Sequence, residues 1–317
     1  MAVQRISWGF TAALIACWPS FTYGQNVEDI FGSVLRENAE AALAVYGIAA
    51  VPSETASTLQ LESTSSKYNT FRAGQFGGGF TLDEEFPLYL EGFIGFTRYD
   101  PQLIISEGGE ESTLPLRWNT VAATGGIGWE FDINENLSIL PMAQFSIGRI
   151  QSDTSIAAQI VAEKLGLDTN FIDGGGLTVG GVGGSLSLIY NKRWESDYEV
   201  DVTFRHTHIH LRPVLDNRNV IASADAITTG FWSRLRIPTG LRLFDRPVRI
   251  VTEASGSYLS GDQGRALSTS WLLQGGAGGE IDFSETWVPL ISTTRLVARY
   301  THGENLTGFS IGLSASF

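Results

Sequence analysis

The chain has 317 residues, of which 43% are hydrophobic and 17% charged, and its formal net charge is −13. This acidic balance, with no basic patch along the sequence, argues against a nucleic-acid partner. No stretch after residue 30 has about 18 consecutive apolar residues, which excludes a helical membrane protein. The mean hydropathy of +0.04 is compatible with a β-barrel, because lipid-facing and lumen-facing residues cancel in such an average.

The first residues have the pattern of a secretory signal. Arg5 supplies the positive charge, residues 6–18 form the apolar core, and Thr22-Tyr23-Gly24 places small residues before a cleavage site at Gln25. The segment Leu14-Ile15-Ala16-Cys17 offers a lipoprotein box as an alternative. Cleavage after Gly24 would remove the single cysteine, so residues 1–24 are predicted to be a signal and the mature chain to lack disulfides.

Residues 26–50 are predicted to form a helix. Asn26 is a suitable N-cap, and Glu28 and Asp29 match the helix dipole in the first turn. Apolar residues then recur at helical spacing until Gly47 and Pro52 end the pattern. We expect residues 25–54 to be a helix and linker that either plugs a barrel lumen or rests under it.

From residue 55 onward, alternation with a period of two replaces the helical period. Read backward from the last residue, it predicts about twelve strands, each long enough to span a membrane. These are residues 305–317, 287–301, 268–283, 247–259, 227–243, 198–213, 176–194, 137–150, 117–133, 86–99, 70–80 and a weak strand at 55–64. Residues 55–317 are therefore predicted to form an all-β transmembrane domain, an antiparallel up-and-down β-barrel.

The connections alternate in length, as they do in outer-membrane barrels. Short connections are predicted at residues 82–85, 134–136, 195–197, 244–246 and 284–285, and longer ones at 100–116, 151–175, 214–226 and 259–267. The short ones are assigned to the periplasmic side and the longer ones to the cell exterior. A soluble sandwich would give no such alternation.

The last strand has one apolar face and ends on an aromatic residue. Phe309, Ile311, Leu313 and Phe317 share the apolar face, and only Gly and Ser occupy the other from Gly308 onward. This ending resembles the C-terminal assembly signal of bacterial outer-membrane β-barrels, which the barrel-assembly machinery reads. The alternative is the edge strand of a soluble sandwich.

If the apolar faces meet lipid, the opposite faces line the lumen. Much of this lining is Gly and Ser, which would let a helix approach the barrel wall. Charged residues share it. The predicted acidic lumen-lining residues, near the periplasmic mouth, are Glu130, Asp132, Glu280 and Asp282, and the basic ones, deeper in, are Arg205, Arg234, Arg249 and Arg295. A polar lumen of mixed charge does not by itself define a selectivity.

A signal, a helix, about twelve strands and a terminal Phe together resemble the autotransporter β-domain. The resemblance implies a monomeric translocator domain that is integral to the outer membrane. It also implies insertion by the barrel-assembly machinery with periplasmic chaperones, and contact with outer-membrane lipid and lipopolysaccharide. The departure is that only residues 25–54 separate the signal from the barrel, so no passenger is expected, which puts export itself in doubt. A small-solute channel is the second interpretation.

Three histidines give the sharpest local pattern. His206, His208 and His210 share one face of the strand at 198–213, and a His-x-His pair on a strand can hold a metal. The same face carries Phe204 and points to lipid, so we favour polar side chains that meet lipopolysaccharide head groups and expect no metal and no cofactor. An outer-membrane lipid hydrolase, the third interpretation, would need Ser two residues after His, where this chain has His208 and His210. We therefore expect no enzymatic activity.

Overall fold

The computed structural model describes residues 40–53, 57–63, 70–83, 85–100, 102–107, 110–115, 118–152, 176–215, 222–283 and 293–316. The predicted signal, the first part of the predicted helix, the turn at 284–285 and Phe317 lie outside these residues. Residues 40–50 are helical, and Val51 closes the last turn by donating its N–H to the Gly47 carbonyl at 2.9 Å.

The described strands follow the predicted order. They are β1 (Ser57–Ser63), β2 (Thr70–Thr81), β3 (Leu88–Asp100), β4 (Gln102–Glu107), β5 (Glu110–Pro115), β6 (Trp118–Trp129), β7 (Phe131–Asn134), β8 (Leu137–Ser152), β9 (Gly176–Arg193), β10 (Glu199–Pro213), β11 (Ala224–Leu243), β12 (Arg246–Gly261), β13 (Trp271–Asp282), β14 (Thr293–Gly303) and β15 (Leu306–Ser316). A short helix, α3 (Asp262–Leu267), lies between β12 and β13.

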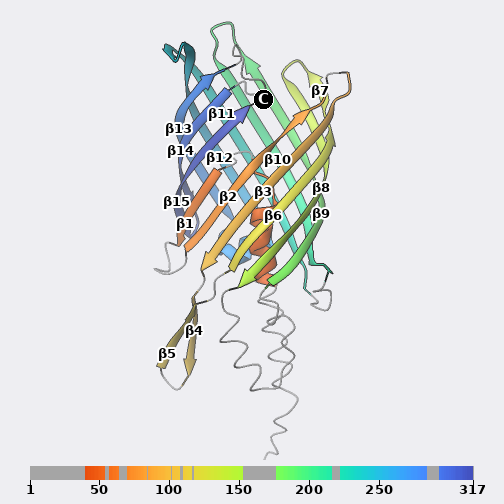
Figure 1. Ribbon diagram of the computed structural model, residues 1–317, viewed down its shortest axis with the longest axis vertical. Helices are drawn as coiled ribbons and strands as arrows, with labels where there is room; N and C mark the ends of the chain where they lie inside the picture. Colours follow the sequence, from red (N-terminus) through yellow and green to blue (C-terminus); the bar gives the residue numbers. More distant parts are fainter. Residues whose placement is uncertain are drawn as a thin grey trace, which may run out of the picture. The chain divides into compact units, whose positions relative to one another are not determined.

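The main sheet closes on itself as an antiparallel barrel (Figure 1). It has thirteen strands in the order β6-β3-β2-β1-β15-β14-β13-β12-β11-β10-β9-β8-β7, and β6 also pairs with β8. Because β6 and β7 continue each other across Glu130, the described wall has twelve strand positions, which confirms the predicted up-and-down barrel. First and last strands meet along seven residue pairs from Ser57–Gly312 to Ser63–Leu306.

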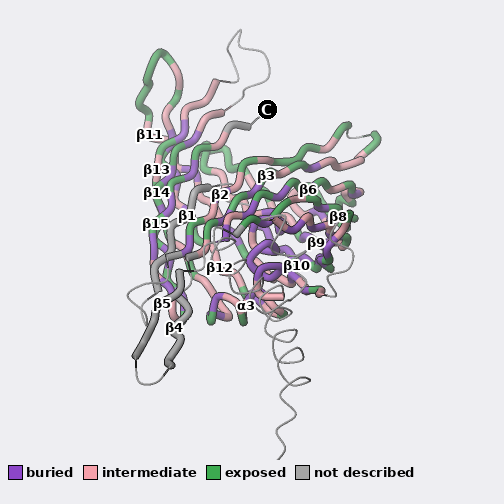
Figure 2. Tube along the Cα trace, turned by 60° about the horizontal axis from the view of Figure 1, so that its bottom comes forward, coloured by how far each residue is buried: buried purple, intermediate pink, exposed green. Residues whose placement is uncertain are grey.

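Exposed and buried residues alternate along the barrel strands (Figure 2). On β15, Phe309, Ile311 and Leu313 are 70%, 60% and 63% exposed, whereas Ser310 is 3% exposed. Large apolar side chains are likewise exposed on the outward faces of other strands, among them Phe76, Ile94, Phe145, Val182, Phe231 and Leu296. The inward faces are small, polar or buried, so the apolar surface lies outside.

Most connections at the two ends of the barrel differ in length; the exceptions are β13 and β14, ten residues apart at the end with short turns, and β14 and β15, joined by two residues at the other end. At what we call the short-turn end, β6–β7 joins β8 through residues 135–136, β9 joins β10 through 194–198, and β11 joins β12 through Phe244 and Asp245. These last two residues have φ of 54° and 60°, as a two-residue type I′ hairpin turn requires. The long-loop end carries α3 and the separate hairpin β4–β5, neither of which was anticipated from the sequence.

A closed barrel satisfies every backbone group between neighbouring strands and can therefore cross lipid. With its apolar outer belt, the described barrel is that of an integral outer-membrane protein. No helix among the described residues is long and apolar enough to span a membrane.

The outward face of β15 gives the first prediction. We expect Leu313→Asp to prevent folding, because a carboxylate on the lipid face costs about 2 kcal/mol on top of the lost apolar contact. Ser314→Asp is the matched control, since Ser314 points inward and lies in register with Arg295. Heat-modifiable gel mobility of outer-membrane fractions measures folding. Equal folding of the two variants would contradict the assignment of faces.

Candidate functional site

The lumen at the long-loop end is occupied by the helix at 40–50 (Figure 1). Leu43, Val45, Tyr46 and Ala50 are all 0% exposed. The helix is apolar on all sides, as is typical of a helix that is fully buried, and apolar residues of the wall surround it. Its neighbours in the same apolar cluster come from strands all round the barrel and from α3: Phe71, Trp118, Ala122, Ile150, Leu177, Val179, Ile209, Leu211, Ala224, Ala226, Leu259, Leu267 and Leu306.

This apolar lining differs from the predicted wall of Gly and Ser. The predicted small residues do face inward at Ser185 and Ser187 of β9, but Leu177 and Val179 of the same inward face are 2% and 0% exposed. The difference has a physical reason. An inward apolar residue is unfavourable in a water-filled pore, but it is favourable where a helix covers it.

The barrel wall caps the carbonyl end of the helix. Gln75 on β2 donates from Nε2 to the Val51 carbonyl at 2.6 Å and to the Ala49 carbonyl at 3.2 Å, and its Oε1 accepts the Ser53 N–H at 2.8 Å. Thr124 on β6 donates from Oγ1 to the Ala50 carbonyl at 2.7 Å. The last carbonyls of a helix have no partners within it, so these two side chains supply the bonds that the carbonyl end of the docked helix requires.

Glycines bring the helix into contact with the wall. A Cβ on Gly95 of β3 would collide with the Ala49 carbonyl oxygen, and a Cβ on Gly148 of β8 would lie 2.7 Å from the Tyr46 ring. On the helix itself, a Cβ on Gly47 would lie 2.8 Å from the Ala226 Cβ. The backbones therefore approach at distances that a side chain would prevent, which fixes the position of the helix.

A buried ion pair crosses the lumen beside the helix. Arg205 on β10 donates to both carboxylate oxygens of Glu91 on β3, with Nη2–Oε1 at 2.8 Å and Nη1–Oε2 at 3.1 Å. Gln144 on β8 donates to Glu91 Oε1 at 2.6 Å. The two charged side chains are 8% and 1% exposed. Because β3 and β10 are not neighbours in the sheet, this group ties distant parts of the wall together.

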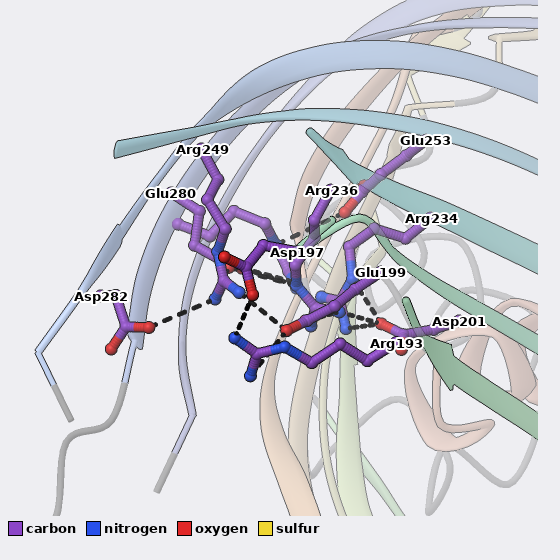
Figure 3. A network of polar contacts seen from close by, with 11 residues as sticks. Arg193, Asp197, Glu199, Asp201, Arg234, Arg236, Arg249, Glu253, Glu280 and Asp282 are labelled. Atoms are coloured by element: carbon purple, nitrogen blue, oxygen red, sulfur yellow. Dashed lines mark hydrogen bonds and ion pairs between the residues drawn. The ribbon is translucent and has the colours of Figure 1, made fainter. Parts of the chain in front are cut away.

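A second ionic network covers the inward faces of β10 to β14 toward the short-turn end (Figure 3). Its centre is the fully buried Glu280, whose Oε1 lies 2.6 Å from Arg249 Nη2 and 3.1 Å from Arg236 Nε. Arg295 Nη1 lies 3.5 Å from Glu280 Oε2. Since both charge signs occupy the same wall and neutralise each other locally, the network stiffens that wall and sets up little field across the lumen.

The network extends around this centre. Asp201 accepts from Arg234 Nη2 at 2.5 Å and from Arg236 Nη1 at 2.7 Å. Glu253 accepts from Arg299 Nε at 2.7 Å, and its other oxygen lies 3.4 Å from Arg295 Nε. Each of these carboxylates is thereby placed against guanidinium groups, as buried charges require.

All eight predicted lumen-lining residues lie on inward faces or at the short-turn mouth. Arg234, Arg249, Glu280 and Arg295 belong to the ionic network, and Asp282 lies at its edge, 3.9 Å from Arg249. Glu130 accepts from Thr81 and Ser138 at 2.5 and 2.7 Å. Asp132 is exposed on β7, and Arg205 joins Glu91. Their functional roles stay predictions.

Sequence reasoning missed the residues that pair with these or hold the helix: Gln75, Glu91, Thr124, Gln144, Arg236, Glu253 and Arg299. Glu91 carried a usable signal, because it is the only acidic residue in the apolar run from Leu88 to Phe96.

The three histidines point outward. His208 Nε2 and His210 Nδ1 each lie 3.0 Å from Asp225 Oδ1 on β11, and His206 Nδ1 lies 2.8 Å from Thr229 Oγ1. Among the residues that the structure describes, no three His, Cys, Asp or Glu side chains are grouped so that they could hold a metal ion.

Three solved domains of autotransporters are similar to this chain. The β-domain of the Bordetella autotransporter BrkA is 12% identical with a TM-score of 0.47, covering 82% of this chain and 96% of that one. The transport unit of AIDA-I from Escherichia coli gives 12% and 0.47, with 89% and 99% coverage. The translocator domain of NalP from Neisseria meningitidis gives 11% and 0.42, with 92% and 98% coverage. No known family profile and no curated protein sequence matches the chain.

The glycine contact predicts how the helix can be dislodged. We expect Gly95→Ala to push the helix end out of place, because the new methyl group would meet the Ala49 carbonyl oxygen, at a cost of about 1–3 kcal/mol. Gly92→Ala on the same strand is the matched control, since a Cβ there meets nothing within 4 Å. Hydrogen exchange of amides 48–53 is the measurement. Equal protection in both variants would contradict the docking geometry.

The cross-lumen ion pair gives a third prediction. Glu91→Gln should lower the free energy of unfolding by about 3 kcal/mol, because it leaves the Arg205 charge buried without a counter-charge from Glu91. The double variant Glu91→Leu, Arg205→Met removes both charges and should stay within about 1 kcal/mol of the wild type. Urea unfolding in lipid vesicles measures both. A double variant less stable than Glu91→Gln would contradict this account.

Proposed function

We propose that the protein is a translocator-type outer-membrane barrel whose lumen is closed by its own helix at 40–50. The single observation that carries the proposal is the capped docking of that helix: four backbone groups between Ala49 and Ser53 bond to Gln75 and Thr124 of the wall. A helix that merely rested in a wide pore would keep water at its carbonyl end. Here the wall provides the partners instead.

A pocket lies beside the helix. It is bordered by the helix, β2, β10 to β13 and α3, and Thr207, Thr228, Ser257 and Gln274 contribute to its polar lining. These hydroxyl and amide groups are suited to hold ordered water next to the docked helix.

The domain organisation that accompanies this proposal has three parts. Residues 1–24 would be a cleaved signal, 25–54 a helix and linker acting as a lumen plug, and 55–317 the barrel. The short-turn end would face the periplasm and the long-loop end the exterior, following the usual asymmetry of such barrels. Insertion would use the barrel-assembly machinery and periplasmic chaperones, with Phe309, Ile311, Leu313 and Phe317 as the signal, and the barrel would act as a monomer without enzymatic activity.

A small-solute channel is the second candidate. The ionic network on β10 to β14 supports it, because charged side chains that line a wall toward the short-turn end are what an aqueous passage would use. Local charge pairing predicts weak ion selectivity for such a channel. A lipid-active enzyme is supported least, since the outward His206, His208 and His210 contact Thr229 and Asp225 and no serine nucleophile follows them.

Planar-bilayer conductance separates the first two candidates. The intact protein should be nearly closed, and a variant lacking residues 26–50 should conduct steadily, because the deletion removes the body that fills the long-loop half of the lumen. Gly95→Ala should give intermediate, flickering openings, and Gly92→Ala should behave as the wild type. Large and stable conductance from the intact protein would favour the channel instead.

A further inference from the structure

The strand β7 lies at the short-turn end of the barrel (Figure 1) and extends past the neighbouring strand β3. Trp129, the last residue of β6, is in register with Leu88, the first residue of β3. The Glu130 N–H then donates to the Pro87 carbonyl at 2.9 Å. Beyond this bond β7 pairs with β8 along one edge, and among the described residues no strand pairs with its other edge. We call this second, free edge of residues 131–134 the β7 edge.

The free backbone groups of the β7 edge place it outside the hydrocarbon of the membrane. In lipid no water is present to bond to unpaired N–H and C=O groups, so a strand with a free edge does not occur there. All four residues of β7 are exposed, and the side chains of Phe131 and Ile133 are 51% and 57% exposed. Two large apolar side chains therefore lie in an aqueous layer, where contact with water is unfavourable.

The connection from β2 to β3 adds apolar surface next to this edge. Leu82 and Phe86 of that connection are 48% and 52% exposed. The Phe86 ring packs edge-to-face on Trp129, with 5.0 Å between the ring centres, and Thr81 Oγ1 donates to Glu130 Oε2 at 2.5 Å. These contacts hold the connection against the last residues of β6. A free backbone edge thus lies beside apolar side chains, which is the combination that an added strand binds.

Four exposed acidic side chains lie on or beside the β7 edge. They are Asp83 and Glu85 of the connection from β2 to β3, and Asp132 and Glu135 of β7 and the turn that follows it. Neither of these two segments, 82–87 and 130–136, contains a basic residue. On β9, the strand beyond β8, Lys192 lies over the Trp194 ring and Arg193 pairs with Asp197. The β7 edge is therefore locally negative.

The charge of the edge decides which strand it accepts. A second copy of this chain, paired edge to edge, would place acidic residues opposite acidic residues, and like charges in register destabilise a sheet. Charged side chains on a short edge strand are a common means of preventing such self-pairing. A strand that carries Lys or Arg reverses the sign of this interaction and adds attraction to the backbone bonds. The β7 edge therefore disfavours a second copy and favours a cationic strand.

We propose that the β7 edge binds an extended, cationic segment of another protein, which adds to the sheet as a further strand. Backbone bonds to residues 131–134 supply the affinity, apolar side chains of the segment cover Phe131 and Ile133, and its basic side chains meet Asp132 and Glu135. The inference requires only the folded barrel with its free edge. It is independent of what passes through the lumen and of how the barrel is inserted into the membrane.

The test uses the purified full-length protein in neutral detergent and a fluorescent seven-residue peptide of alternating Lys and Val. Two reference peptides have Glu in place of Lys, or keep Lys and carry a methyl group on every backbone nitrogen, which prevents strand pairing. Fluorescence anisotropy should show that the Lys peptide binds about tenfold more tightly than either reference, because only this peptide has both the charge and the backbone donors. The bound peptide should also slow hydrogen exchange of the amides at 131–134.

Two matched double variants locate the site. Asp132→Asn with Glu135→Gln removes two charges at the β7 edge and should weaken binding of the Lys peptide about fivefold. Glu195→Gln with Asp245→Asn removes two exposed charges from other short turns and should leave binding unchanged. The proposal would be overturned by no measurable binding of the Lys peptide, by a reference peptide that binds equally well, by equal affinities of the two double variants, or by slowed exchange at amides other than 131–134.

Discussion

Closure of the sheet is the constraint on which the rest of this structure depends. In lipid no water is present to satisfy a free strand edge, so β1 must pair with β15 and the chain must supply strands until the ring is complete. Twelve strand positions then enclose a space wider than their own side chains fill, whereas about eight strands would be filled by the wall itself. The interior therefore needs additional contents, and the chain provides them from a helix and from paired charges.

The two halves of the lumen are filled by different kinds of interaction. At the long-loop end the filling is apolar: Ile209 and Leu211 of the wall face a helix rich in Ala, and its carbonyl end is capped by Gln75 and Thr124. Toward the short-turn end the wall of β10 to β14 is charged, and Glu280 is neutralised by arginines of neighbouring strands (Figure 3). Where the helix leaves off, the pair of Glu91 and Arg205 spans the lumen.

The wall of the barrel could be predicted from the sequence because alternation is a local property. The strand at 198–213, for example, differs from β10 by one residue, and the outward position of His206 follows from Phe204 on the same face. The predicted strand at 287–301 begins earlier than β14 does. The hairpin β4–β5 was predicted as a loop, because strands that are not part of the barrel wall need not alternate apolar and polar residues.

The contents of the lumen could be predicted only in part. Arg205 was expected to face inward, but its partner Glu91 is 114 positions away, and their meeting depends on the order and register of strands across the barrel. The rule that inward residues are polar also fails for Leu177 and Val179, because their environment is set by a helix that no strand pattern reveals.

The most direct test of the central claim, that the helix at 40–50 lies inside the barrel, is an oxidative cross-link. Gly47→Cys and Ala226→Cys would be combined with Cys17→Ser. A Cβ on Gly47 would lie 2.8 Å from the Ala226 Cβ, so a shift of the helix by about 1 Å brings the two to the separation of a disulfide. The account predicts efficient disulfide formation in native outer membranes, and none when the second cysteine replaces the adjacent Ile227. It would be contradicted if the cysteines at positions 47 and 226 formed no more disulfide than those at positions 47 and 227.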